Sequence, residues 1–384
     1  MKPNFLHLLA YFLLASIVSG CASYGVIGNE PVRDLESESE YSVRSHVAED
    51  GKSDLSLRVS FSGGGTRAAA LGSRVLLVLR DTQIMVDGDP ARLLDQVDSI
   101  SSVSGGSFTS AYYGLHGDGL FEDFEEVFLR YDIQGHLVRS TLNPLHWFSR
   151  KGRTERAIEY YEKKVFHNAT YAEMRKPGRP LIVINASDLS HGVRFSFIQE
   201  YFDLLCSDLS TYSVARAVTA SSAVPVVFHP VVVENYPGCG EEHYEWLAKM
   251  SEKAQAEGDA ELNFLADGLG SFADKENRKY IHFVDGGITD NMGLRAIYDT
   301  VTISGGAGAY VSKLNKRPPR KLALIAVDAS TEPVYEMDVT NKQPSLGQSI
   351  GAVTGVQLHR YNTATLELLG NTLREWSDTL ATDG

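Results

Sequence analysis

The chain has 384 residues, of which 43% are hydrophobic and 22% charged, as expected for a globular protein with a large core. Asp and Glu number 49 against 36 Lys and Arg, which gives a net charge of −13. This acidity excludes nucleic acid as an expected partner and argues against electrostatic docking on anionic lipid headgroups. Any attachment to a membrane therefore needs another origin.

The first twenty residues have the pattern of a secretory signal peptide. Lys2 is the only formal charge in residues 1–20, and an apolar run over 5–18 follows it. This run is too short to span a bilayer comfortably, but it suits the hydrophobic region of a signal peptide. The stretch V-S-G-C (18–21) then resembles a bacterial lipobox. The resemblance implies removal of residues 1–20 and acylation of Cys21, whereas a plain signal peptide is the alternative.

The residues after Cys21 predict a lipid-anchored protein of the bacterial cell envelope. An aspartate directly after the lipidated cysteine is associated with retention in the inner membrane. This chain has Ala22 at that position, so the outer membrane is the preferred location. Residues 21–53 are polar, acidic and rich in Ser and Glu, without a helical or strand period. Such a composition is typical of a flexible tether. A single folded domain is expected over 54–384.

From Leu55 onward, strand patterns alternate with helix patterns. Such alternation predicts an α/β fold, with a mainly parallel central sheet and helices on both faces. Two strands, 280–287 and 321–330, are apolar almost throughout, which is typical of buried parallel strands. The predicted strands are 55–61, 96–103, 180–187, 193–198, 280–287 and 321–330, and the predicted helices are 68–82, 107–117, 211–221 and 347–376.

Two insertions interrupt this alternation. Residues 116–175 are predominantly helical and aromatic in pattern, whereas residues 234–279 are polar and predict an irregular excursion outside the core. Besides Cys21, the chain has Cys206 and Cys239, which could form a disulfide in an oxidising compartment or remain two buried thiols. The absence of a C-x-x-C motif and of a His/Cys cluster predicts no metal site. No cofactor is expected.

Residues 101–107, SSVSGGS, are close to the G-x-S-x-G signature of serine hydrolases. In that signature a sharp strand-to-helix turn exposes the serine, and small neighbours avoid collisions where the chain folds back. Ser102 replaces the first glycine and adds only a hydroxymethyl group, so the turn remains plausible around Ser104. The alternative is that Ser104 merely caps a helix.

Three consecutive glycines, Gly63, Gly64 and Gly65, follow the first predicted strand. Their backbone N–H groups, with a helix behind them, predict an anion site for a phosphate or for the oxyanion of a tetrahedral intermediate. A phosphate loop is disfavoured because the chain has no G-x-x-x-x-G-K-[ST] motif there. A dinucleotide-binding motif is disfavoured because Arg67 follows where that motif needs a third spaced glycine. An oxyanion hole fits if a nucleophile lies nearby.

No histidine is convincingly placed to activate Ser104. His359 falls inside a predicted helix, and His282 precedes Asp285 by three residues, so strand alternation directs the two to opposite faces. Asp285 ends an apolar strand and is followed by two glycines. A carboxylate in a poorly solvated site has a raised pKa and is a better proton acceptor. Asp285 is therefore the candidate general base, although the same residues also favour a simple turn.

Four segments occur in this order: SGGGTR (62–67), SVSGG (102–106), ASSAVPVVF (220–228) and VDGG (284–287). Together with INASDLSHG (184–192), they resemble the patatin-like phospholipases, relatives of cytosolic phospholipase A2, over roughly residues 55–330. The resemblance implies a three-layer α/β/α fold and a Ser–Asp dyad without histidine. It assigns Ser104 as nucleophile, Asp285 as base, Gly63–Gly65 as oxyanion hole, and Arg67 and Gly106 as supporting residues.

The expected function is hydrolysis of carboxyl esters of membrane lipids, phospholipids or lysophospholipids, through an acyl-enzyme intermediate. Arg67 is expected to stabilise the glycine loop or to pair with a substrate phosphate. Two alternatives remain: a general esterase or thioesterase acting on small acyl substrates, and a catalytically inactive lipid-binding lipoprotein. Membrane lipids are thus the expected partners, and the sequence leaves the oligomeric state open.

Overall fold

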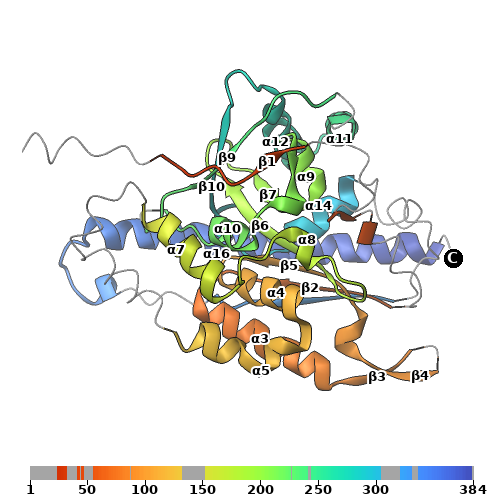
Figure 1. The fold of residues 1–384 in the computed structure, drawn as a ribbon. Coiled ribbons are helices and arrows are strands. Elements are labelled where there is room, and N and C mark those ends of the chain that lie inside the picture. Colours follow the sequence, from red (N-terminus) through yellow and green to blue (C-terminus); the bar gives the residue numbers. More distant parts are fainter. Residues whose placement is uncertain are drawn as a thin grey trace, which may run out of the picture.

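The computed structural model describes residues 24–32, 41–43, 45–46, 55–86, 88–131, 152–225, 227–240, 244–303, 321–330 and 336–382. The expected signal peptide and the expected lipidation site, Cys21, lie outside these ranges. Figure 1 shows the described elements gathered around one central sheet, with the long helix α16 running across the width of the molecule. The structure thus covers every residue of the predicted dyad and glycine loop.

The central sheet has seven strands in the order β11-β2-β5-β6-β10-β9, with β7 pairing with β6. The pairs β11/β2, β2/β5 and β5/β6 are parallel, and β9 runs in the same direction because it is antiparallel to β10, which is antiparallel to β6. The sheet is therefore mainly parallel, as predicted. Its strands are β2 (Leu55–Phe61), β5 (Val97–Val103), β6 (Leu181–Asp188), β7 (Arg194–Ser196), β9 (Val231–Glu234), β10 (Tyr280–Asp285) and β11 (Lys321–Val327).

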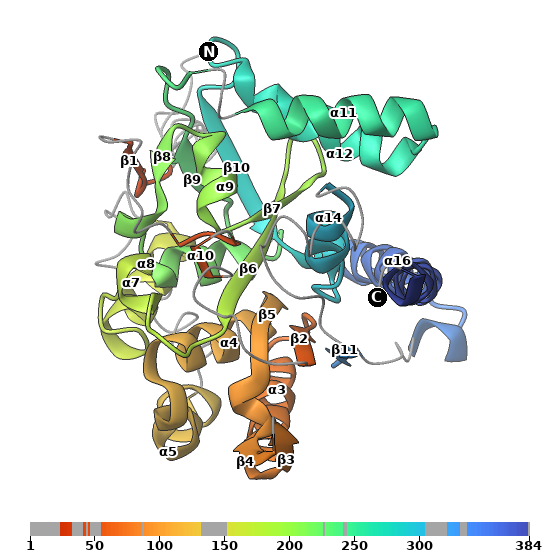
Figure 2. The same cartoon turned by 90° about the vertical axis from the view of Figure 1, so that its right-hand side faces the viewer.

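Helices cover both sides of this sheet. Figure 2 shows α4, α7, α8 and α10 on one side and α14 and α16 on the other, so the α/β fold class is confirmed. The helices are α3 (Thr66–Asp81), α4 (Gly105–His116), α5 (Leu120–Phe124), α7 (Arg153–Lys164), α8 (Tyr171–Met174), α9 (Gln199–Asp203), α10 (Val214–Ser221), α11 (Glu245–Glu257), α12 (Ala260–Gly270), α13 (Gly287–Asp290), α14 (Arg295–Ile303) and α16 (Leu346–Thr382). Shorter strands are β1 (Glu30–Pro31), β3 (Gln83–Val86), β4 (Asp89–Arg92) and β8 (Ser207–Asp208).

The direction predicted for β10 is wrong. Its residues pair antiparallel with β6, Phe283 opposite Asp188, and antiparallel with β9, Tyr280 opposite Glu234. An apolar run of six to eight residues has the same pattern in either direction, so its partners decide the direction. The expectation that 234–279 is irregular is also wrong, because α11 and α12 occupy most of it. Each helix buries one stripe of apolar residues, and the polar residues between them belong to its exposed face.

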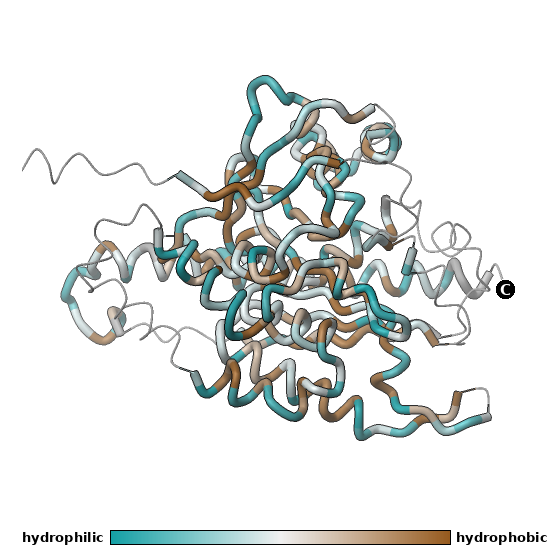
Figure 3. The backbone as a smooth tube through the Cα atoms, viewed as in Figure 1, coloured by the Kyte–Doolittle hydropathy of each residue, from teal (hydrophilic) through white to brown (hydrophobic). Residues whose placement is uncertain are grey.

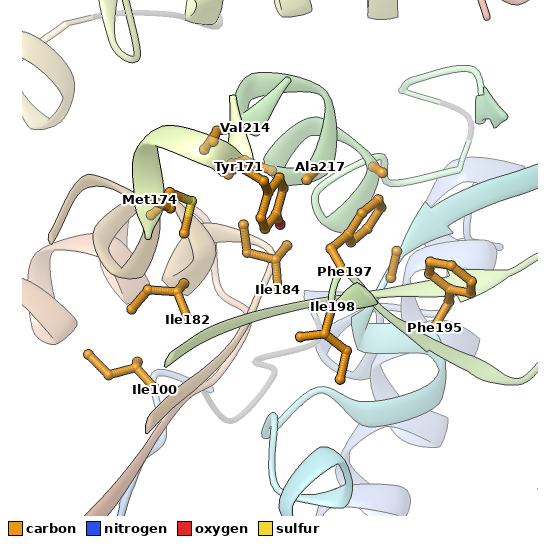
Figure 4. Close-up of a cluster of buried hydrophobic side chains, with 14 of the residues drawn as sticks. Ile100, Tyr171, Met174, Ile182, Ile184, Phe195, Phe197, Ile198, Val214 and Ala217 are labelled. Carbon is orange, nitrogen blue, oxygen red and sulfur yellow. The ribbon is translucent and has the colours of Figure 1, made fainter. Parts of the chain in front are cut away.

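The hydrophobic core lies where the sheet meets α4, α8 and α10. In Figure 3 the outer turns are mainly hydrophilic, whereas the strands at the centre carry hydrophobic stretches. Figure 4 shows isoleucines of β5 and β6 below the side chains of α8 and α10, beside Phe195 of β7 and Phe197, which follows that strand. These buried residues are Ile100, Ile182, Ile184, Tyr171, Met174, Val214, Ala217, Phe195 and Phe197. Their packing holds β5 and β6, the strands that lead to the predicted site.

The described parts of the expected flexible tether pack against the domain. Tyr41 is 2% exposed, and its hydroxyl accepts the backbone N–H of Ile182 at 2.8 Å. The side chain of Asn29 bonds to the backbone N–H and C=O of Glu234, both at 2.9 Å. β1 also pairs with β8. The tether prediction is therefore wrong for these residues, since a few well-placed polar and aromatic side chains anchor a segment whose overall composition is that of a linker.

Helix α16 has 37 residues and packs on the segment that follows β10. Leu369 is buried with Met292 and Leu294, and the Thr365 hydroxyl accepts a hydrogen bond from Arg295 Nε at 3.0 Å. Despite this length, no helix in the described part of the chain combines the length and the apolar character needed to cross a bilayer. The role of α16 in the fold is thus to cover one face of the sheet.

A disulfide joins Cys206 and Cys239, whose Cα atoms lie 5.5 Å apart. The sequence had left this pairing open, because two cysteines separated by 33 positions can meet only if the fold brings them together. The bond closes a loop that contains α10 and β9. It therefore restrains a segment next to the predicted site.

Breaking this disulfide should lower the free energy of unfolding by about 2–4 kcal/mol, because the unfolded chain regains the entropy of the open loop. Urea denaturation of the wild type with and without reductant measures the effect. The Cys206→Ser/Cys239→Ser double variant is the control, and its unfolding should not respond to reductant. A wild type whose midpoint is unchanged by reductant would contradict the prediction.

Candidate active site

Ser104 occupies the turn between β5 and α4. Its backbone has φ 51° and ψ −121°, a conformation that a non-glycine residue adopts only when its surroundings impose it. Two neighbours allow this turn by having no side chain. A Cβ on Gly105 would stand 1.9 Å from the Gly65 oxygen, and one on Gly106 would stand 2.6 Å from Phe61 Cβ. The turn thus has the strained geometry of a nucleophile elbow.

The departure at Ser102 from the usual glycine is accommodated by a hydrogen bond. Ser102 is fully buried in β5, and its hydroxyl lies 2.6 Å from that of Ser110 on α4. The Ser102 hydroxyl therefore has a hydrogen-bond partner, and its side chain fits into the core without disturbing the turn at Ser104. The structure agrees with the expectation that the substitution is compatible with the elbow.

Ser104 and Asp285 meet although 181 positions separate them. The Ser104 hydroxyl donates a hydrogen bond of 2.9 Å to Asp285 Oδ2, and both residues are 8% exposed. The other carboxylate oxygen of Asp285 accepts the backbone N–H of Gly287 at 2.8 Å. Gly286 permits this approach of β10 to β6, since a Cβ there would stand 2.3 Å from the Asn185 oxygen. The geometry is that of a hydroxyl paired with a positioned proton acceptor.

Burial raises the pKa of Asp285 from its usual 3.8 to about 6, and the hydrogen bonds from Gly287 and Ser104 oppose this effect only in part. A carboxylate with a pKa near 6 is ionised at neutral pH and is a stronger base than an ordinary aspartate. Among the residues that the structure describes, no histidine bonds to either member of the pair. His282 is exposed on β10, and His359 lies within α16.

The last residue of α10 and the segment after it support both members of the pair. The Ser221 hydroxyl accepts the backbone N–H of Ser104 at 2.8 Å and donates to the Asn185 carbonyl at 2.6 Å. The Ala223 carbonyl accepts the backbone N–H of Asp285 at 3.0 Å. Ser221 belongs to the motif at 220–228, but the sequence did not single it out. A serine in a small-residue segment has no local signal that separates such a role from a helix end.

The glycine loop lies against the elbow, but its three amides are not equivalent. The N–H of Gly63 donates to the Asn291 carbonyl at 2.9 Å and is therefore already engaged. The amides of Gly64 and Gly65 have no acceptor in the described part of the chain, and both residues are exposed. Their φ angles are 141° and 61°, which only glycine adopts without strain. The expected three-amide anion site thus reduces to two amides.

Arg67 lies in the first turn of α3 and is exposed. Its guanidinium Nη2 is 3.4 Å from the Ala329 carbonyl, which follows β11 and adjoins Gly64. No carboxylate within the described ranges forms an ion pair with it. The contact joins the glycine loop to the end of β11, in line with the loop-stabilising role expected of Arg67.

Within the described residues, no group of three His, Cys, Asp or Glu side chains is arranged to hold a metal ion. The reactive groups that the structure brings together at the site are the serine hydroxyl, the buried carboxylate and the backbone amides. Such a set can transfer an acyl group through a covalent serine ester.

Comparison with known proteins agrees with the motifs and the geometry. The sequence model of the patatin-like phospholipase family matches residues 59–298, more than half of the 384-residue chain. The matched region begins within β2 and ends within α14, so it contains the glycine loop, the elbow and Asp285. A search of curated proteins finds no significant match. The chain belongs to the patatin-like phospholipase family and carries the lipid acyl hydrolase domain typical of it.

Proposed function

We propose that the protein hydrolyses carboxyl esters of phospholipids or lysophospholipids, with Ser104 as nucleophile and Asp285 as general base. The observation that carries this proposal is the 2.9 Å hydrogen bond between the Ser104 hydroxyl and the buried Asp285 carboxylate. The strained backbone at Ser104 supports it further, because strain of this kind clusters at functional sites.

In the first half of the reaction, Ser104 Oγ attacks the ester carbonyl carbon while its proton passes to Asp285 Oδ2. The carbonyl oxygen becomes an oxyanion, which the Gly64 and Gly65 amides stabilise. Loss of one such donor typically costs about 3–4 kcal/mol of transition-state stabilisation. The tetrahedral intermediate collapses as the C–O bond breaks, and the leaving alcohol takes the proton from Asp285. Ser104 then carries the acyl group as an ester.

In the second half, Asp285 accepts a proton from a water molecule as that water attacks the acyl-enzyme carbonyl. The second oxyanion occupies the same two amides. When it collapses, the bond to Ser104 Oγ breaks, and Asp285 returns the proton to Oγ. The fatty acid leaves, and the pair regains its starting state.

The reaction should slow in acid as Asp285 becomes protonated. Because burial raises the pKa of Asp285 to about 6, kcat/KM is expected to fall about tenfold per pH unit below that value and to level off above about pH 7. A profile of kcat/KM with a soluble ester, between about pH 4.5 and 8.5, measures this limb. A rate that stays constant down to about pH 5 would mean that no base of raised pKa is involved.

The substrate class is tested by mass analysis of intact lipids after incubation with the purified enzyme. We expect free fatty acid and a deacylated lipid, formed at a rate that rises sharply above the micellar threshold of the lipid. Hydrolysis of only soluble short-chain esters or thioesters would support a general esterase instead. Vesicle binding without any hydrolysis would support a lipid-binding protein.

We also propose that the mature protein is anchored through an acylated Cys21 in the bacterial cell envelope, preferably in the outer membrane. The lipobox pattern at 18–21 supports this, and so does the Cys206–Cys239 disulfide, which favours an oxidising compartment. Cells fed labelled palmitate should incorporate the label into the wild type but not into a Cys21→Ser variant. A wild type without label would refute the anchor and leave the catalytic proposal untouched.

A further inference from the structure

Asn291 lies between the glycine loop and the turn that carries Asp285. Its side chain is 5% exposed, six positions after Asp285. Asn291 Oδ1 stands 2.5 Å from where a Cβ of Gly63 would be and 3.0 Å from where a Cβ of Gly287 would be. The same position on Gly63 is 3.5 Å from Ser104 Cβ. The carboxamide therefore lies between the glycine loop and the turn after Asp285, and Ser104 borders the same glycine.

The backbone of Asn291 also decides which amides of the loop remain available. Its carbonyl accepts the Gly63 N–H at 2.9 Å, which leaves Gly64 and Gly65 as the free donors. The Gly63 amide is thus not available as a third donor, because it already donates to Asn291, the residue whose side chain also lies against the loop. One residue both fixes the loop and presents a polar group beside it.

The carboxamide of Asn291 has no hydrogen-bond partner within the described part of the chain. Neither polar atom of this amide is among the fully enclosed side-chain atoms without a partner, so water can reach the amide from the site, and a ligand that enters can replace that water. An asparagine offers two N–H donors and one carbonyl acceptor, and a half turn of the amide exchanges their places. An unpartnered donor group beside a candidate nucleophile points to a ligand that completes its hydrogen bonding.

We propose that the Asn291 side chain donates a hydrogen bond to the ester group of the substrate and to the oxyanion that forms from it. It supplies the third donor of the oxyanion hole, beside the Gly64 and Gly65 amides. This inference rests on the proposed function of Ser104 and Asp285. It adds a side chain to an oxyanion hole otherwise made of backbone amides. Unlike a backbone amide, this donor can be removed by mutation.

Two variants of Asn291 test the proposal. Asn291→Ala keeps the backbone carbonyl that holds Gly63 but removes the donor, so kcat should fall about 100- to 1,000-fold with little change in KM. Asn291→Asp keeps the shape but places a negative charge beside the oxyanion and Asp285. Its kcat should fall further, and the acid limb of its pH profile should move to higher pH, because a second carboxylate makes Asp285 harder to ionise.

A matched control is Asn235→Ala, which removes another buried asparagine, whose side chain bonds to Lys275 and to the backbone carbonyls of Phe272 and Arg278. This variant should lose stability but keep kcat, whereas Asn291→Ala should keep its urea midpoint and lose kcat. Wild-type kcat in a folded Asn291→Ala would overturn the proposal, and so would a loss explained by unfolding or by KM alone.

The failure of the proposed function has a different signature. A fluorophosphonate should label the wild type at Ser104, and the Asn291→Ala variant more slowly. A wild type that is neither labelled nor active refutes the dyad itself. Labelling of wild type and Asn291→Ala at equal rates refutes only the role of Asn291.

Discussion

Replacing Ser104 by alanine should lower kcat/KM for lipid esters by at least about 10⁴-fold, because no other group in the proposed mechanism can form the acyl-enzyme. Alanine keeps the size of the side chain and removes only the oxygen that bonds to Asp285. The measurement is release of fatty acid from phospholipid or lysophospholipid dispersions by purified, folded protein. Unchanged hydrolysis by this variant would remove the enzymatic assignment of the site.

Two further variants separate chemistry from folding. Ser104→Gly should be equally inactive but more stable than Ser104→Ala by about 1 kcal/mol, because glycine adopts φ 51° without strain. Ser110→Ala changes a buried serine on α4, the helix that follows Ser104, and does not touch a partner of Asp285, so it should stay within a few-fold of wild-type activity. An inactive Ser110→Ala would show that helix α4 tolerates no change, which would weaken the conclusion from Ser104.

Replacing Asp285 by asparagine should also lower kcat/KM by at least about 10⁴-fold, since the amide has the shape of the carboxylate but cannot accept the proton. The structure offers no histidine in the described ranges to take over this task. We therefore expect the residual rate of Asp285→Asn to lose the acid limb near pH 6 that the wild type should show. Retention of that limb would assign it to another group.

The same variant should unfold at a higher urea concentration than the wild type at pH 8. The folded pKa of Asp285, about 6, lies above its unfolded value of 3.8, so the folded state loses stability as pH rises through this range, and the full cost of the ionised carboxylate is present above it. Removing this charge should stabilise the protein by about 1–3 kcal/mol at pH 8 and by progressively less toward pH 4. Asp328→Asn, an exposed aspartate after β11, is the control and should change neither activity nor stability appreciably. Equal effects of both variants at pH 8 would argue against a costly buried charge at Asp285.

The sequence was sufficient to predict the fold class, the ends of most strands and the residues that meet at the site. Each of these depends on the residue types within a short stretch of sequence. Alternating and apolar runs define the strands, and turns that admit no Cβ require glycine, as at Gly105 and Gly286. The elbow and the glycine loop lie at the carboxyl ends of the parallel strands β5 and β2, so predicting these strands also placed the two near one another. Asp285 reaches the elbow from the antiparallel strand β10, where it pairs with Ala186 next to the end of β5. Their catalytic roles remain predictions.

Only the tertiary structure decided the direction of β10, the pairing of Cys206 with Cys239, and the packing of Tyr41 on the domain. It also decided that the Gly63 amide is occupied by Asn291 and that Ser221 holds the backbone of Ser104. In each case the partner lies far along the chain, and the local pattern is the same with or without it. Hydrogen bonds and close contacts between distant segments depend on how the sheet brings those segments together, so no single stretch of sequence contains them.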